Sequence, residues 1–404
     1  MNVATESAAL TERKYIVPLV LITSLFFLWA LGVNLNDVLI PHLKKAFRLT
    51  DLESSLIQTA FFGGYFLAAL PAGRLMERIG YKKGILTGLL LCATGALLFI
   101  PAATILVYGF FLFALFVMAC GQSFLEVAAN PYVTVLGPPE SAERRLNLAQ
   151  SFNSVGAVVT PILGAAFILT NTQGEAAQLA EANTVKVPYM IIAAIFLAVA
   201  AMIYVTKLPE VQESAPEPQK LSEVWKHPRL VRGVLAQFFY VGAQVGVASF
   251  IIRLSEYLAP GTSDKAAASF LKWHLLGFMI GRFAGSAMMK YIPAQRLLAA
   301  FAVGCLVCVT IALVATGSVP IYAVVLIGFF HSIMFPTIFA LSIKGLGAYT
   351  KLGSSLLVMS IIGGAVLPAT MGYVSDATNI QRALIIPLLC YLYILNFAAR
   401  TREA

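Results

Sequence analysis

Long runs without a charged side chain are the feature of this sequence that most restricts its fold. A helix needs about 20 predominantly apolar residues to cross the hydrocarbon core of a bilayer. Ten runs reach that scale, and the two longest are each long enough for two spans. The runs cover residues 15–36, 54–73, 84–125, 146–174, 187–206, 233–252, 266–289 (interrupted only by Lys272 and Arg282), 297–343, 352–375 and 383–399. The sequence therefore predicts twelve transmembrane helices, with the long runs divided near Pro101 and at the turn signal in residues 317–320.

The composition agrees with this assignment. Hydrophobic residues make up 59% of the 404-residue chain and charged residues 12%, whereas soluble domains carry about 25% charged residues. We therefore expect an all-α membrane protein embedded in the lipid bilayer. A soluble enzyme, a nucleic-acid binder and a disulfide scaffold are excluded as descriptions of the whole chain. The first run is too long for a signal peptide and lacks a small-residue cleavage site, so we expect it to be retained.

One polar stretch, residues 209–228, separates the sixth and seventh predicted spans. We expect a linker at 208–228 between two six-helix halves, 1–207 and 229–404. A weak repeat with an offset of 205–207 residues relates the halves. Its members are the pairs Gly156 and Gly363, Pro161 and Pro368, Pro131 and Pro336, and by register Glu126 and His331. Two parallel, pseudo-symmetric halves with the substrate site between them are typical of a major-facilitator transporter.

Basic residues set the expected orientation. If the N-terminus is cytoplasmic, nineteen Lys and Arg residues fall in cytoplasmic segments and eight in external ones, and Arg282 lies within a span. Cytoplasmic loops of membrane proteins collect Lys and Arg. We therefore expect a multi-pass protein with both termini in the cytoplasm, and the same rule explains the net charge of +9.

Two of the nineteen acidic residues, Asp37 and Glu126, fall inside predicted spans rather than in loops, tails or span ends. A carboxylate in hydrocarbon is costly, so such a residue normally faces a cavity and functions there. The alternative is a buried acid that only holds helices together. Asp37 is expected to lie nearer the membrane surface than Glu126, because only about 10 Å of helix rise separates it from Lys44.

Polar side chains form stripes on several predicted spans. The stripes are Asn34 and Asp37; Gln122, Glu126 and Asn130; Asn147, Gln150 and Ser154; and Gln237, Tyr240 and Gln244. Residues at i, i+3, i+4 and i+7 share a helix face. Together with the aromatic rings of Trp29, Tyr65 and Tyr132, these amides and carboxylates suit a polyhydroxylated ligand, whose hydroxyls both donate and accept hydrogen bonds. Hydrogen bonding between helices is the alternative role for each amide.

Enzyme and metal signatures are missing from the sequence. The four histidines are scattered, there is no GxxxxGK[ST] phosphate-binding loop, and the Cys305/Cys308 pair has no nearby histidine or charged residue. We expect no enzymatic activity, no cofactor and no metal site, and we read both cysteines as small packing residues.

Residues 73–83 (GRLMERIGYKK) resemble the loop signature of the major facilitator superfamily, with Glu77 where aspartate is usual. Gly73 would let a neighbouring helix approach closely, and Glu77 with Arg78 would latch helix ends together. This motif indicates gating rather than substrate chemistry.

Longer motifs resemble the fucose–proton symporter family over nearly the whole chain. They are residues 24–29 (SLFFLW), 34–37 (NLND), 125–137 (LEVAANPYVTVLG), 145–154 (RLNLAQSFNS), 236–244 (AQFFYVGAQ), 335–339 (FPTIF) and 371–376 (MGYVSD). The resemblance implies that Asp37 and Glu126 are the protonatable pair and that Asn34 and Gln150 bind sugar. It also implies proton-driven uptake across the bacterial inner membrane.

Two departures bear on the choice of sugar. Residues 245–250 (VGVASF) are small and apolar where the resemblance leads us to expect a bulkier aromatic residue, and residues 333–335 (IMF) are less polar than expected. The family includes glucose and galactose carriers, so the hexose need not be fucose.

The resulting hypothesis is a monosaccharide–proton symporter that works by alternating access as a monomer. We predict that Asn34, Gln150, Glu126, Asp37, Gln122, Asn130, Gln237, Tyr240, Gln244 and Trp29 contact substrate, and that Gly73, Glu77 and Arg78 gate it. A sodium-coupled or uniporting sugar carrier is the first alternative. A sugar-responsive sensor would need a signalling domain, and a multidrug exporter would need no amide stripes.

Overall fold

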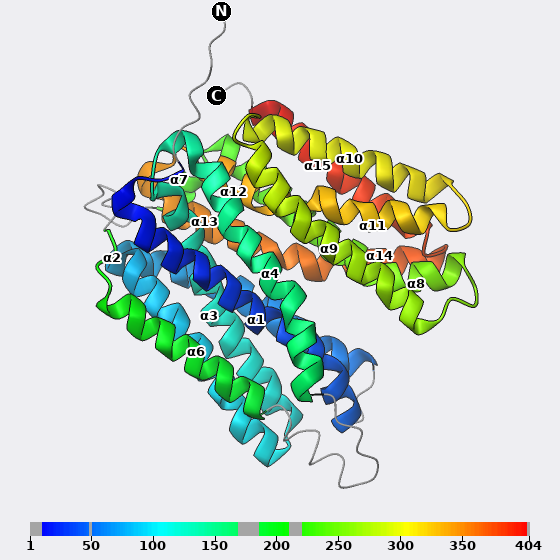
Figure 1. Cartoon of the computed structure of the whole chain (residues 1–404), viewed down its shortest axis with the longest axis horizontal. Coiled ribbons are helices and arrows are strands. Elements are labelled where there is room, and N and C mark those ends of the chain that lie inside the picture. The colour runs from blue at the N-terminus through cyan, green and yellow to red at the C-terminus, as the bar shows by residue number, and fades with distance from the viewer. Residues whose placement is uncertain (1–9, 48–50, 169–185, 210–219, 402–404) are drawn as a thin grey trace, which may run out of the picture.

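The computed structural model confirms an all-helical membrane protein with twelve spans (Figure 1). It describes residues 10–47, 51–168, 186–209 and 220–401, and within these ranges no β-strand occurs. The first half contains α1 (Ile16–Ala46), α2 (Asp51–Ile105), α3 (Tyr108–Val135), α4 (Ala142–Ile168) and α6 (Lys186–Val205). The second contains α8 (Pro228–Leu258), α9 (Asp264–Met288), α10 (Ala294–Val314), α11 (Val319–His331), α12 (Met334–Ile343), α13 (Thr350–Met359), α14 (Gly363–Ala377) and α15 (Ile385–Arg400).

The twelve spans follow when kinked and interrupted helices are taken into account. Helix α2 holds two spans, because Gly80 turns the chain with φ of 77°. Helices α11 and α12 form one interrupted span, and α13 and α14 form another. The predicted division at Pro101 is wrong: Pro101 lies inside α2, and the chain turns at Leu106, whose φ is 56°, and Val107. The division predicted at 317–320 is confirmed, since α10 ends at Val314 and α11 begins at Val319.

The two halves lie close together at the end of the molecule where both termini are marked and diverge at the opposite end (Figure 1). We call the end that carries the start of α1 and the end of α15 the termini face. Across the junction α4 packs on α9 and α12, and α2 packs on α13. The short helix α7 (Leu221–Val224) connects the halves, while residues 210–219 of the predicted linker lie outside the described residues, so its bounds stay a prediction.

The sequence repeat corresponds to a repeated packing contact. A methyl group added at Gly156 would lie 2.7 Å from the carbonyl oxygen of Phe27 on α1, and one added at Gly363 would collide with the carbonyl oxygen of Phe238 on α8. In each half, therefore, the glycine lets the fifth span approach the backbone of the first. Small residues serve this purpose in membrane helix packing.

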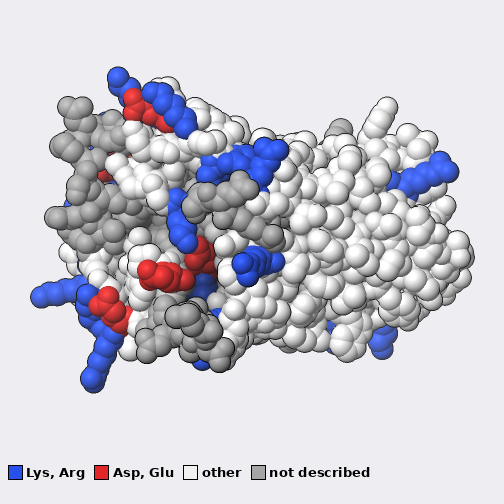
Figure 2. Space-filling view, turned by 90° about the horizontal axis from the view of Figure 1, so that it is seen from above, with Lys and Arg blue, Asp and Glu red and all other residues white. Residues whose placement is uncertain are grey.

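Charged side chains cover only part of the surface. Figure 2 shows Lys, Arg, Asp and Glu gathered toward one side of the view, and a broad area that carries almost none. Exposed apolar side chains such as Val303, Val307 and Val314 on α10 and Leu389 on α15 belong to the apolar surface. Such a surface is stable against lipid hydrocarbon rather than water.

The close contact at Gly363 generates a stability prediction. We expect Gly363→Ala to lower the melting temperature in detergent, because the added methyl forces α14 away from α8, and overpacking of this kind costs about 1–3 kcal/mol. Gly372→Ala, on the same helix, meets no atom within 4 Å and should leave the melting temperature unchanged or raise it, since alanine is the better helix former. Equal effects of the two substitutions would contradict the packing argument.

Candidate substrate pocket between the two halves

A cavity of about 210 Å³ lies between the halves near the middle of the spans. It is smaller than the roughly 300–1,000 Å³ of pockets for drug-sized ligands, so it fits a small molecule. Its walls are formed by Trp29, Asn34, Phe61, Phe62, Tyr65, Glu126, Gln150, Asn153, Val241, Gln244, Val245, Arg282, Phe335 and Ile361.

The first half supplies a polar, aromatic wall. Asn34 on α1, Glu126 on α3 and Gln150 on α4 bring two amides and a carboxyl to the cavity, beside the ring of Trp29. Glu126 is 7% exposed and Gln150 is 3% exposed, so both polar groups are almost removed from bulk water. Buried polar groups of this kind require partners. The Glu126 Oε2 has none among the described residues, and a ligand hydroxyl would supply one.

The second half supplies a mostly apolar wall. Val241 and Val245 on α8, Phe335 on α12 and Ile361 face the cavity, and Gln244 and Arg282 are its polar members. Val245 and Phe335 belong to the two segments that depart from the fucose-carrier pattern, so those departures fall directly on the pocket wall.

Arg282 joins the two walls, although the sequence analysis gave it no role. Its guanidinium donates to the backbone carbonyl of Gln150, to the Gln150 Oε1 at 3.3 Å and to the Asn153 Oδ1 at 3.4 Å, and its Nε donates to the carbonyl of Ser332 at 3.1 Å. Its charge also interacts with that of Glu126. The signal that could have found it is the position of an arginine inside a predicted span, which is as costly there as a carboxylate.

The interruption between α11 and α12 gives Arg282 its carbonyl partner. An interrupted helix leaves backbone carbonyls that must be satisfied inside the membrane. The Ser332 carbonyl accepts from Arg282, and the preceding His331 carbonyl accepts from the Tyr240 hydroxyl at 3.1 Å. The His331 ring in turn shares a 2.7 Å hydrogen bond with the Tyr391 hydroxyl. Tyr240 therefore supports the interruption from behind and does not line the pocket.

Three of the remaining predicted substrate contacts, Gln122, Asn130 and Gln237, are absent from the cavity lining and lie next to it along their helices. Gln122 accepts a hydrogen bond from the Tyr65 hydroxyl at 3.4 Å, and the Oδ1 of Asn130 accepts one from Gln150 at 2.9 Å. Gln237 is fully buried and is discussed below. Asp37 lies in α1, but its side chain is outside the described part of the chain. Tyr132, proposed as a stacking surface, is elsewhere: its hydroxyl donates to the carbonyl of Pro209.

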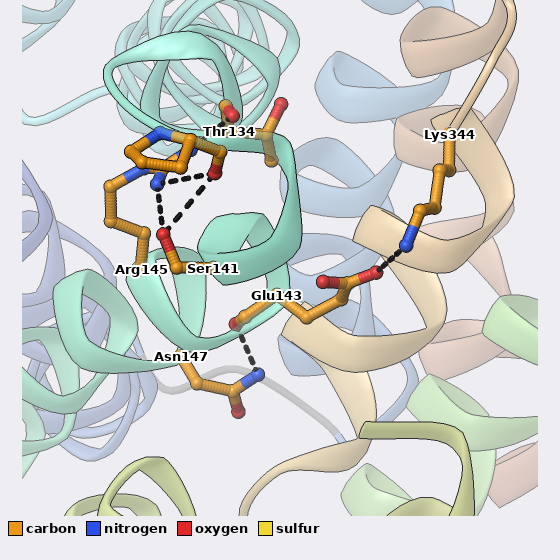
Figure 3. A network of polar contacts seen from close by, with 7 residues as sticks. Thr134, Ser141, Glu143, Arg145, Asn147 and Lys344 are labelled. Atoms are coloured by element: carbon orange, nitrogen blue, oxygen red, sulfur yellow. Dashed lines mark hydrogen bonds and ion pairs between the residues drawn. The ribbon is translucent and has the colours of Figure 1, made fainter. Parts of the chain in front are cut away.

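The pocket is closed toward the termini face by a contact between the halves that we call the seam. It consists of Gly73 against Ser355, Asn147 bonded to Thr337 and Glu143 paired with Lys344. The Asn147 Nδ2 donates to the Thr337 Oγ1 at 3.1 Å. Figure 3 shows the ion pair, in which the Lys344 Nζ lies 2.9 Å from the Glu143 Oε1. Gly73 is required here because a methyl group at that position would overlap the Ser355 side chain.

Arg145 anchors the first-half side of the seam. This residue is 1% exposed, and its guanidinium donates to the carbonyls of Val133 and Thr134 at the end of α3 and to the Ser141 hydroxyl (Figure 3). A cation at the carboxyl end of a helix satisfies free carbonyls and the negative end of the helix dipole. The start of α4, which carries Glu143, is thereby fixed to α3. The other two predicted gating residues lie on α2: Glu77 is partly buried and Arg78 is exposed.

Among the described residues, no group of three or more His, Cys, Asp or Glu side chains is arranged to hold a metal ion. The described residues of the cavity wall supply amide groups, the Glu126 carboxyl group and the Arg282 guanidinium.

Comparison with known proteins identifies the fold. The Major Facilitator Superfamily profile matches residues 22–368. The chain belongs to the major facilitator superfamily. It is a multi-pass membrane protein of a transporter superfamily and not an enzyme, as the sequence predicted.

Relatives in this superfamily are similar over almost their full length. A glucose/galactose transporter of Brucella abortus is 45% identical over 387 residues, covering 95% of this chain and 94% of the relative. The L-fucose-proton symporter of Escherichia coli is 44% identical over 417 residues, covering 98% and 95%. The crystal structure of the transporter FucP in the outward conformation matches with a TM-score of 0.90 and 43% identity, covering 97% of this chain and 100% of that one.

The ion pair in the seam generates a prediction about its opening. Lys344→Glu places two carboxylates together, so we expect the seam to open more often. The labelling rate of a cysteine introduced at Ser355 by a soluble thiol reagent should rise roughly fivefold, since a partly exposed pair contributes up to about 1 kcal/mol. The exchange variant Glu143→Lys/Lys344→Glu should restore slow labelling. If the double variant labels as fast as Lys344→Glu, the pair does not hold the seam.

Proposed function

We propose that this protein is a proton-coupled symporter for a monosaccharide, fucose or a related hexose such as glucose or galactose. The observation that carries the proposal is Glu126, a carboxyl group buried in a pocket whose other polar groups are mainly amides, together with the Arg282 guanidinium. Amides recognise hydroxyls, and the carboxyl exchanges a proton. The glucose/galactose transporter of Brucella abortus and the L-fucose-proton symporter of Escherichia coli, each more than 40% identical, support both parts.

The asymmetric walls suit a pyranose. Hydroxyls on one side of the sugar would bond to Asn34, Gln150 and Glu126, while the apolar C–H surface would pack on Phe335 and Val245. A hydroxyl donates one hydrogen bond and accepts two, so it can pair with an amide in either sense. The amide wall favours sugar transport over drug export, for which apolar contacts would suffice.

The proposed coupling between proton and sugar transport depends on the charges of Glu126 and Arg282. A charged carboxylate in this pocket is stabilised by Arg282, whose guanidinium also bonds to Gln150 and Ser332. Protonation of Glu126 removes its negative charge, and with it the electrostatic attraction to Arg282, which bonds to both halves. Asp37 on α1 is the second protonatable group of the proposal.

The seam and the divergence of the halves support alternating access. With the seam closed, the pocket can open only away from the termini face. The excess of Lys and Arg toward that face supports cytoplasmic termini, so the proposed state faces outward across a bacterial inner membrane. We propose that one chain suffices for transport, because the pocket is built entirely within it.

Substitution of the two pocket amides tests sugar recognition. Asn34→Ala and Gln150→Ala should each weaken hexose binding by roughly 5- to 150-fold, because an unpaired buried polar group costs about 1–3 kcal/mol. Asn396→Ala, on the exposed face of α15, should bind as the wild type does. Calorimetry on purified protein measures all three, and unchanged affinity in both pocket variants would show that the sugar binds elsewhere.

Coupling is tested by Glu126→Gln, which keeps the size of the side chain and mimics its protonated form. Exchange of external for internal sugar should persist, because the loaded carrier still reorients. Uphill accumulation driven by a pH gradient should be lost, because no proton is released. Glu256→Gln, at an exposed position near the end of α8, is the control. If Glu126→Gln in proteoliposomes still concentrates sugar in response to pH, Glu126 is not the coupling site and Asp37 takes that role.

A further inference from the structure

A layer of polar side chains lies directly beneath the pocket, on the side of the termini face. Asn130, Asn147 and Gln237 are each one helical turn from a pocket-lining residue: four after Glu126, three before Gln150 and four before Val241. Residues three or four apart share a helix face, so each amide continues the pocket face of its own helix. We call these three residues and Thr337, the bonding partner of Asn147, the amide layer.

All four members of the amide layer lie on the termini-face side of the pocket. Helices α3 and α12 run toward the termini face, since Arg145 binds the end of α3 and Lys344 of the seam follows α12. Helices α4 and α8 run away from it, so earlier residues lie nearer that face. The layer therefore occupies the path that a ligand must cross if the seam opens.

Hydrogen bonds within the closed protein use only part of the capacity of the layer. The Asn147 Nδ2 donates to Thr337 and to the Glu143 carbonyl, but the Asn147 Oδ1 has no partner among the described residues. Neither the Oε1 nor the Nε2 of Gln237 has a hydrogen-bond partner within that same part of the chain. Asn147 and Gln237 are both 0% exposed.

If the side chain at position 237 served only to hold helices together, an unpaired glutamine would be a destabilising residue there. Unpaired buried polar groups destabilise a protein, and an apolar side chain of the same shape would be at least as stable. Within the described part of the chain, the layer offers two free acceptors, Asn147 Oδ1 and Gln237 Oε1, and two free donors, Gln237 Nε2 and Asn130 Nδ2. A hydroxyl group pairs with either kind.

We propose that the amide layer is a second sugar-binding site, occupied after the seam opens and before the sugar leaves on the termini side. Gln237 and Asn147 are its principal ligands, and its substrate class is the same polyhydroxylated monosaccharide. The inference rests on the proposed sugar transport and adds a site distinct from the pocket of Asn34, Glu126 and Gln150.

The test uses Gln237→Met, which keeps the length of the side chain and removes its hydrogen bonds, in the full chain. Transport is measured in right-side-out and inverted membrane vesicles, so that sugar enters from a defined face. The probe is whichever of D-galactose, D-glucose and L-fucose the wild type carries fastest, with its singly deoxygenated analogues. The matched control is Gln244→Met on the same helix, which alters the pocket itself.

For Gln237→Met we expect KM for entry from the termini face to rise roughly 5- to 150-fold. At least one deoxy analogue, lacking the hydroxyl that Gln237 binds, should be unaffected there. Sugar affinity from the opposite face should stay at the wild-type value, whereas Gln244→Met should change it. The melting temperature of the sugar-free Gln237→Met protein should be equal to or above that of the wild type.

Three results would overturn the second site. An unchanged KM would show that Gln237 does not contact sugar. An equal rise in KM for the hexose and for every deoxy analogue would show that Gln237→Met changes how often the seam opens and that Gln237 does not contact the sugar. A lower melting temperature would show that the amide stabilises the closed protein. If the wild type carries none of the three sugars from either face, the proposed function itself fails.

Discussion

The buried guanidinium of Arg282 connects the features on which the proposed transport cycle depends. It bonds to Gln150 in the first half and to the Ser332 carbonyl at the interruption of the tenth span, and its charge interacts with Glu126. A cation at this depth must keep such partners. Movement of either half therefore changes the hydrogen bonding of a pocket amide and the stabilisation of the Glu126 carboxylate together. This is the physical route by which protonation, sugar binding and reorientation can be coupled.

The interface between the two halves contains two kinds of contact, one at the pocket and one at the seam. The pocket side presents groups that a ligand can satisfy, while the contacts on the seam side include the Glu143–Lys344 ion pair, the Asn147–Thr337 hydrogen bond and a close approach at Gly73. Partly exposed pairs of this kind are individually weak. Such a junction can open repeatedly, because the helices on either side stay intact and only a few interactions are exchanged. One proton crossing 100 mV supplies about 2.3 kcal/mol, or roughly fifty-fold accumulation.

The sequence predicted the fold well because apolar runs and their interruptions depend on local residues alone. The all-helical fold with twelve spans was foreseeable, and so was the position of Glu126 at a cavity. Pro101 does not mark the turn between the third and fourth spans, since a proline is tolerated inside a membrane helix, and the turn at Leu106 carries no strong local signal. Helix periodicity also placed Gln237 and Tyr240 on the same helix face as Gln244, but it could not distinguish residues that line the cavity from residues next to it.

The role of Arg282 could not be derived from periodicity, because its partners are 132 and 50 residues away along the chain. Asn153, Val241 and Ile361 were missed for the same reason: the two walls meet only in the folded protein. A rule that treats every intramembrane charge as a candidate site residue would have found Arg282, though not its partners.

The central claim is that a proton gradient drives sugar accumulation through the Glu126 pocket. The most direct test is uptake of a panel of radiolabelled hexoses by proteoliposomes of the wild-type protein, with sodium absent and the external medium acidic. We expect that at least one of fucose, glucose and galactose accumulates above its external concentration, and that collapse of the pH gradient returns it to equilibrium. Accumulation that requires a sodium gradient, or uptake that never exceeds equilibrium under a pH gradient, would contradict it.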